Sequence, residues 1–197
     1  MPLKISTIPM NVLAAATLAL MLGGCTAIMS STHDEPIKND PGSRSFGSVI
    51  DDQTIEATAT VNIHKSDPQL EDANVMVTSY NGVVLLSGQV PDAEARDIAA
   101  RTAALVKGVR RVYNELAIGA NADFAVRSSD TLITAKIKTK LLATADIKDS
   151  RVRIVTEDGT VYMLGLVTRA EGKIAGKVAQ NTEGVQKVVL LFEYIDG

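Results

Sequence analysis

Apolar and polar positions alternate along two stretches of the chain, residues 74–90 and 151–167, and both stretches follow almost the same pattern. In each stretch the alternation runs up to a pair of turn-forming residues, Asn81-Gly82 or Asp158-Gly159, and an apolar run follows. A period of two is typical of β-strands, and Asn-Gly and Asp-Gly supply the positive φ angles that a type I′ turn requires. Each stretch is therefore predicted to form a β-hairpin.

The same two elements follow each predicted hairpin. A helical segment covers residues 91–107 after the first hairpin and residues 168–182 after the second. A Gly-Val step then opens a β-branched strand, over residues 108–115 and 184–194. Because the glycines of the two hairpins are offset by 77 residues, we interpret the chain as a tandem repeat of one small unit.

A helix is also predicted ahead of each hairpin. Apolar residues recur there at every fourth position: Ile55, Ala59 and Ile63 in the first copy, and Ile133, Ile137 and Leu141 in the second. This spacing places each set on one face of a helix. Asp51-Asp52 and Ser129-Asp130 precede these stripes, and since such residues cap helix N-termini, the helices are predicted to begin there.

Each repeat thus has the order helix, strand, strand, helix, strand, and the predicted fold class is α+β. The hairpin strands are antiparallel and the crossover helix makes the third strand parallel to the second, which gives a three-stranded mixed sheet. Two helices are expected to cover one face of this sheet, because a small sheet must bury its apolar side. We place the first domain at residues 51–117, a linker at 118–129 and the second domain at 130–197.

The N-terminus has the features of an export signal. Lys4 is the only charge ahead of an apolar run over residues 10–22, which is too short to span a bilayer and fits a signal-peptide core. The single cysteine, Cys25, follows Leu-Gly-Gly, and this sequence resembles the lipobox of bacterial lipoproteins. The resemblance implies a signal peptide over residues 1–24 and acylation of Cys25. Thr26, rather than Asp, follows the cysteine, which implies transfer to the outer membrane.

Residues 25–50 connect this N-terminus to the first repeat. They are rich in Ser, Gly, Pro and Asp and show no sustained period. Such a composition is typical of a flexible tether. We expect one short helical turn near residues 43–48.

The repeats resemble a known domain family. The positions that carry the resemblance are Val83, Leu85, Gly88, Val90, Gly108, Val109, Val112 and Asn114 in the first copy, and Val161, Met163, Gly165, Val167, Gly184, Val185 and Val188 in the second. This pattern is similar to that of the BON (bacterial osmotic-stress and nodulation) domain, and the second copy departs from it where Leu190 replaces the asparagine. With the lipobox, the two copies resemble the dual BON-domain outer-membrane lipoproteins of Gram-negative bacteria.

That resemblance implies a fold and a function. The fold would be two tandem αββαβ domains, without enzymatic activity. The protein would face the periplasm, bind anionic phospholipid through the first helix of the second domain, and support outer-membrane integrity.

Composition argues against several other classes of function. The chain has no basic tract and only 4% aromatic residues, so it provides neither clustered phosphate contacts nor a stacking platform, and no nucleic-acid partner is expected. The two histidines are His33, in the tether, and His64, near the end of the first helix, where we expect it to be solvated. With no cysteine in the repeats, we expect no catalytic, metal or cofactor site.

The two repeats differ in charge. Residues 26–124 carry 8 Lys and Arg against 14 Asp and Glu, a net charge of −6. Residues 125–197 carry 11 Lys and Arg against 9 Asp and Glu, a net charge of +2. An anionic surface would therefore attract the second repeat.

The first helix of the second repeat carries the candidate binding surface. On a helical wheel, the side opposite its core stripe presents two leucines with small residues between them and a lysine on each edge: Leu132, Ala135, Lys136, Lys138, Thr139 and Leu142. Apolar residues flanked by lysines are typical of a helix that lies on anionic lipid. The equivalent positions of the first repeat, Thr54 among them, carry no lysine and serve as an internal control. The alternative is that Leu132 and Leu142 pack against the first repeat or the linker.

Two functions stay open on these grounds. One is a lipid-binding module that recognises an anionic phospholipid membrane. The other is a protein-interaction adaptor, for instance for the outer-membrane protein assembly machinery, that uses the acidic first repeat or an exposed sheet edge.

Overall fold

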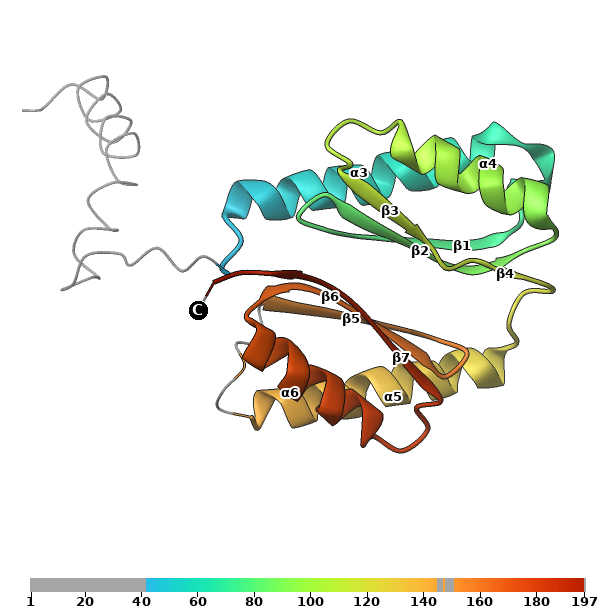
Figure 1. Ribbon diagram of the computed structural model, residues 1–197. Coiled ribbons are helices and arrows are strands. Elements are labelled where there is room, and N and C mark those ends of the chain that lie inside the picture. Colours follow the sequence, from blue (N-terminus) through green and yellow to red (C-terminus); the bar gives the residue numbers. More distant parts are fainter. Residues whose placement is uncertain (1–41, 145–146, 148–150, 197) are drawn as a thin grey trace, which may run out of the picture. The chain divides into compact units, whose positions relative to one another are not determined.

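The computed structural model describes residues 42–144, 147 and 151–196, and all of them belong to one compact unit that spans residues 40–197. The predicted signal peptide, Cys25 and most of the predicted tether lie outside the described residues. The unit contains two successive sets of helices and strands (Figure 1).

The first set opens with the longer of its helices. Its elements are α3 (Phe46–Ser66), the short 3₁₀ helix η1 (Pro68–Leu70), β1 (Asn74–Tyr80), β2 (Val83–Val90), α4 (Ala93–Ala104), β3 (Arg111–Asn114) and β4 (Ala117–Ile118). The second set repeats this order without the short elements: α5 (Phe124–Leu142), β5 (Val152–Glu157), β6 (Thr160–Val167), α6 (Arg169–Gln180) and β7 (Lys187–Tyr194).

Both sheets are mixed, which confirms the predicted α+β class. β2 lies between an antiparallel β1 and a parallel β3, and β6 lies in the same way between β5 and β7. The first sheet has one strand more than predicted, because β4 also pairs with β2 beyond β3. Leu116, between β3 and β4, is buried in the core, and this inward turn interrupts what would otherwise be one edge strand.

The two hairpin turns have the predicted geometry. Asn81 and Gly82 have φ angles of 53° and 72°, and Asp158 and Gly159 have φ angles of 46° and 69°. These paired positive values are those of a type I′ turn, whose twist matches the flanking strands.

The helices that precede the hairpins begin earlier than predicted. α3 begins at Phe46, after the N-cap Ser45, whose hydroxyl accepts a hydrogen bond from the Ser48 amide at 3.1 Å. α5 begins at Phe124, after the N-cap Asp123. The predicted starts at Asp51-Asp52 and Ser129-Asp130 were therefore wrong, and of the turn expected near residues 43–48 only residues 46–48 are helical, as the beginning of α3. Asp51 and Asp52 instead lie inside α3, and Asp130 lies inside α5.

The apolar stripes of these helices form the domain cores as predicted. Ile55, Ala59 and Ile63 are at most 3% exposed and pack with residues of β1, β2 and α4. The corresponding stripe of α5 packs with residues of β5, β6 and α6. Figure 1 shows α3 and α4 on one face of the first sheet, and α5 and α6 on one face of the second.

The other faces of the two sheets pack against each other, which the sequence analysis did not predict. A third apolar cluster contains Tyr80, Val83, Leu85, Val155, Tyr162, Leu164 and Leu191, from both sheets. Every residue of β2 is buried for this reason. Strands that are covered on both faces have continuous apolar runs, and residues 83–86 are such a run. The unit thus has two helix layers outside and two sheets inside (Figure 1).

Asn114 and Leu190, where the copies differ, connect the last strand to a helix in different ways. The Asn114 side-chain amide donates a hydrogen bond of 3.0 Å to the Arg96 carbonyl of α4. Leu190 of β7 lies instead against Gly176 of α6, where a methyl group on the glycine would be 3.2 Å from Leu190 Cδ1. The second copy has therefore replaced a polar contact by an apolar one.

Candidate lipid-binding surface

The outward side of α5 is exposed along its whole length. Leu132 is 62% exposed and Leu142 is 67% exposed, so neither leucine packs against the first domain or the linker. Ala135 and Thr139 are exposed between them. The Thr139 hydroxyl donates a hydrogen bond of 3.0 Å to the Ala135 carbonyl, which occupies its proton within the helix. This side of the helix therefore presents an apolar line.

Phe124 extends this line, and the sequence analysis missed it. It is the first residue of α5 and is 79% exposed. Phe124 and Leu142 are five full helical turns apart, so they point in the same direction, about 27 Å apart along the axis. We define Phe124, Leu132, Ala135, Thr139 and Leu142 as the outer line of α5. Phe124 was missed because the helix had been predicted to begin after it.

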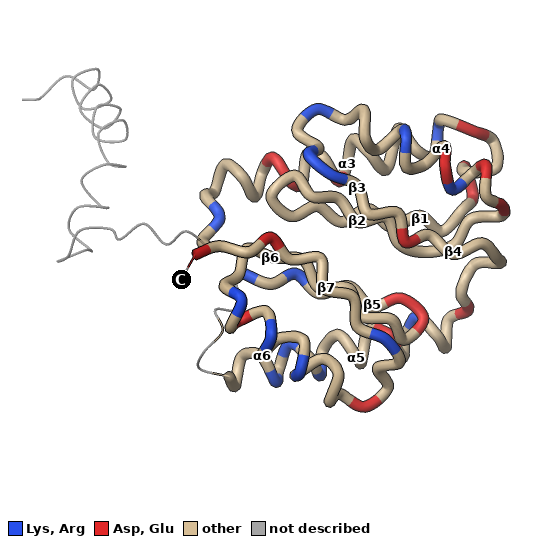
Figure 2. The backbone as a smooth tube through the Cα atoms, in the orientation of Figure 1, with Lys and Arg blue, Asp and Glu red and all other residues tan. Residues whose placement is uncertain are grey.

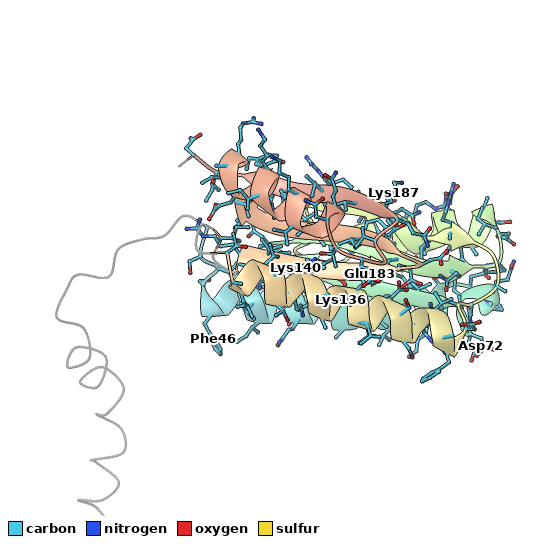
Figure 3. All side chains as sticks on the ribbon, turned by 90° about the horizontal axis from the view of Figure 1, so that it is seen from below. Phe46, Asp72, Lys136, Lys140, Glu183 and Lys187 are labelled. Carbon is cyan, nitrogen blue, oxygen red and sulfur yellow. The ribbon has the colours of Figure 1, made fainter. Side chains whose placement is uncertain are left out.

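The lysines of α5 differ in their surroundings. The Lys136 ammonium lies 3.1 Å from a carboxylate oxygen of Glu183, and Figure 3 shows these two side chains beside each other. Lys140 donates hydrogen bonds to the Asn181 carbonyl and the Thr182 hydroxyl, beyond the end of α6. Lys138 is exposed and makes no ion pair with another described residue. Lys138 thus has neither an ion pair nor a hydrogen bond with another described residue, whereas the Lys140 ammonium is held by two neutral oxygens.

α3 is less different from α5 than the sequence indicated. Thr54, the counterpart of Leu132, is exposed. The outward side of α3 has no lysine at the positions that correspond to Lys136 and Lys138 of α5. However, Phe46, Ile50 and Val61 are 82%, 45% and 51% exposed. Figure 3 shows Phe46 projecting from the start of α3. The contrast between the helices is therefore mainly one of charge, and Figure 2 shows the blue segments of Lys and Arg along α5 and α6.

A buried carboxylate fixes α3 to the first hairpin. Asp52 is 3% exposed and accepts hydrogen bonds from the amides of Asn81 and Gly82, at 2.8 and 2.9 Å, and from the Ser79 hydroxyl at 2.7 Å. Arg44 adds an ion pair at 2.9 Å. Burial by itself would raise the pKa of Asp52, but these hydrogen bonds outweigh it and hold that pKa below its ordinary value.

Asp130 orients α5 in the same way. It is 6% exposed and accepts hydrogen bonds from the amides of Asp158 and Gly159, at 2.8 and 2.9 Å. Asp52 and Asp130 are offset by 78 residues, three positions ahead of Ile55 and Ile133. An aspartate at the same position ahead of the apolar stripe in both repeats was the sequence signal for this role. The preference of aspartate for helix N-caps led to a different interpretation.

The described residues offer little for metal binding. They contain no group of three or more His, Cys, Asp and Glu side chains that could hold a metal ion. His64 is half-buried rather than solvated as expected, and its Nδ1 lies 2.7 Å from the Leu70 carbonyl oxygen. Among the described helices, none has the length and apolarity that a bilayer span requires.

Comparison with known proteins agrees with this architecture. Residues 51–120 and 129–196 match the BON domain. The chain belongs to the BON-domain family. Its two matches cover most of the residues of the described unit, so each αββαβ set is one BON domain, and the candidate surface lies on the first helix of the second BON domain.

Similar proteins include three relatives that align with this chain over more than two-thirds of their own length. It is 35% identical over 185 residues to the outer membrane lipoprotein DolP of Haemophilus influenzae, an alignment that covers 91% of this chain and 96% of the relative. It is 37% identical to the 21 kDa hemolysin of Actinobacillus pleuropneumoniae, over 83% and 82% of the two chains. It is 29% identical to osmotically-inducible protein Y of Escherichia coli, over 77% and 76%.

Proposed function

We propose that this BON-domain protein is an outer-membrane lipoprotein that binds anionic phospholipid through α5 of its second BON domain and so supports outer-membrane integrity. The similarity to an outer membrane lipoprotein over almost the whole chain supports the location. The observation that carries the binding role is the exposed outer line of α5, with the unpaired Lys138 beside it.

Acylation of Cys25 would anchor the protein on the periplasmic side. Cys25 lies outside the described residues, and the lipobox-like sequence ahead of it supports the proposal. Each methylene that enters the bilayer contributes about 0.8 kcal/mol, so two or more acyl chains hold a protein stably where one chain does so only marginally. Anchored there, α5 would meet the membrane at a high local lipid concentration.

Contact of α5 with the membrane would combine two effects. Leu132 and Leu142 would enter the boundary between head groups and acyl chains, as the apolar faces of interfacial helices do. Each Lys near an anionic surface adds about 1 kcal/mol. We expect Lys138 to contribute more than Lys136, because Lys136 forms a surface ion pair with Glu183. The function is thus binding, with no chemical step assigned to any residue.

A second candidate function is that of a protein-interaction adaptor, for instance for the outer-membrane assembly machinery. The observation that favours it is strand β7, which among the described residues pairs on one side only, with β6. Leu190 and Tyr194 of this edge strand are 42% and 46% exposed. An edge strand of eight residues can accept a strand from a partner protein.

Co-sedimentation with lipid vesicles tests the proposal. The chain without residues 1–25 retains the whole compact unit and lacks the acylation site, so any binding comes from the folded part. We expect it to sediment with phosphatidylglycerol vesicles and not with zwitterionic phosphatidylcholine vesicles. Equal binding to both vesicle types, or binding to neither, favours the adaptor.

A further inference from the structure

A groove lies beside α5, at the edge strands of the two sheets. It has a volume of about 490 Å³ and is lined by residues of α5, β5 and β1. The side chains that matter for its chemistry are Arg127, Thr131 and Lys138 of α5, Arg153 and Thr156 of β5, and Met76 of β1. On the helical wheel, Arg127 and Lys138 lie beside Phe124 and Leu142, which belong to the outer line. The groove therefore adjoins the apolar surface described above.

Three cations line this groove, and two of them are unpaired. Neither the Arg127 guanidinium nor the Lys138 ammonium makes an ion pair with another described residue. Arg153 lies 3.9 Å from Glu56, at the limit of an ion pair, and half of its side chain is exposed. Its guanidinium is therefore held only weakly.

The two carboxylates of the groove lining are already engaged. Asp130 directs its oxygens at the amides of Asp158 and Gly159. Glu157 accepts a hydrogen bond of 2.7 Å from the Gln89 side chain. Burial raises the pKa of Glu157, while the hydrogen bond from Gln89 and the nearby positive charge of Arg127 act to lower it. The groove lining thus has three cations against two carboxylates, and both carboxylates accept hydrogen bonds within the fold.

The groove also offers a hydrogen-bond donor. The hydroxyls of Thr134 and Thr156 lie 2.7 Å apart and share one hydrogen bond. Since one proton occupies that bond, the other hydroxyl proton is free to point into the groove. A hydroxyl proton with two unpaired cations matches the oxygens of a singly charged phosphate group.

We propose that this groove binds the phosphodiester head group of an anionic glycerophospholipid, with the acyl chains along the outer line of α5. The proposal rests on the proposed function and assigns a specific site to it. Charge complementarity selects the phosphate, and the exposed Met76 and the adjoining outer line favour a lipid over free phosphate.

Two variants of α5 with the same loss of charge separate a site from diffuse attraction. Lys138→Gln removes a cation of the groove, and Lys136→Gln removes the cation paired with Glu183 on the other flank of the helix. Both residues are exposed, so both variants should fold. Binding of the chain without residues 1–25 to phosphatidylglycerol vesicles should weaken at least about tenfold in Lys138→Gln and in Arg127→Gln, because each loses a charge-assisted hydrogen bond. Lys136→Gln should weaken it less than about threefold.

The vesicle outcomes distinguish the two proposals. Equal losses in Lys136→Gln and Lys138→Gln overturn the groove site but leave lipid binding by α5 intact. Failure of the parent chain to bind phosphatidylglycerol vesicles overturns the proposed function and the lipid occupant with it.

A soluble head group identifies the source of the phosphate. In an NMR titration with glycerophosphoglycerol, the amides of Thr131, Thr134 and Thr156 should shift and saturate. Inorganic phosphate should shift them only at concentrations more than about tenfold higher. Equal potency of inorganic phosphate shows a free-phosphate site and overturns the lipid assignment, and unshifted amides with both compounds overturn the groove as a binding site.

Discussion

Asp52→Asn should destabilise the first domain, although it changes only one atom of the side chain and removes one charge. The Asp52 carboxylate accepts hydrogen bonds from two backbone amides of the hairpin turn, from the Ser79 hydroxyl and from an Arg44 nitrogen. All four distances are 2.9 Å or less. The amide nitrogen of asparagine cannot accept, so at least one buried donor loses its partner. A buried unsatisfied donor costs about 1–3 kcal/mol, and the remaining bonds lose the assistance of the charge.

We expect a total loss of about 2–4 kcal/mol in the free energy of unfolding. For a unit of this size, that corresponds to a fall of roughly 5–15 °C in the melting temperature. Urea unfolding followed by circular dichroism would measure it. Asp51→Asn is the matched control, because the neighbouring Asp51 is exposed and its charge holds no turn. That variant should stay within about 0.5 kcal/mol of the parent.

The same carboxylate should make stability depend on pH. The pKa of Asp52 is lowered in the folded state. The ionised carboxylate therefore contributes its full stabilisation of the fold above the unfolded pKa of about 3.9. It is lost as the pH falls from there through the folded pKa. Asp52→Asn should therefore lose less stability on acidification than the parent does. If both the urea midpoint and the acid limb match those of the parent, Asp52 does not hold the turn.

Three further predictions concern other parts of the chain. Gly88→Ala should cost several kcal/mol in urea unfolding, because Gly88 has a φ angle of 113° and a methyl group there would overlap the Asn74 carbonyl; Gly119→Ala, in open space, should be neutral. Leu164→Ala, between the sheets, should cost about 2–5 kcal/mol, and a loss below 1 kcal/mol would contradict the sheet-on-sheet packing. Cys25→Ser should release the protein from the membrane fraction on cell fractionation, and a variant that stays fully bound would argue against acylation as the main anchor.

Features that are encoded locally could be predicted from the sequence. Asn81-Gly82 requires a type I′ turn wherever it occurs between strands, and the fourth-residue spacing from Ile55 to Ile63 defines one face of a helix in any context. The outward direction of Leu132 followed from the same periodicity. These features depend on neighbours within a few residues, which a single sequence contains.

Features that depend on distant residues could not be predicted. Asp52 was interpreted as an N-cap, because its contacts are with a turn about 30 residues further on. The ion pair of Lys136 with Glu183 joins residues 47 positions apart. The periodicity of β2 indicated that its faces are apolar. It did not indicate which surface covers the face that points away from the helices. The beginning of α5 at Phe124 was hidden by the polar residues that follow it.

Leu132→Glu tests most directly whether α5 binds anionic lipid. Leu132 is 62% exposed and both residues favour helix, so the change should alter stability by less than about 0.5 kcal/mol. It removes an apolar contact with the membrane and adds repulsion from the head groups, together about 2 kcal/mol, or roughly thirtyfold in affinity.

The measurement is co-sedimentation of Leu132→Glu with phosphatidylglycerol vesicles, with Thr54→Glu as the matched control on α3. We expect binding to fall roughly thirtyfold in Leu132→Glu and by less than about threefold in Thr54→Glu, with circular dichroism of both variants unchanged. A folded Leu132→Glu protein that binds these vesicles as the parent does would contradict the assignment of α5 as the lipid-binding surface.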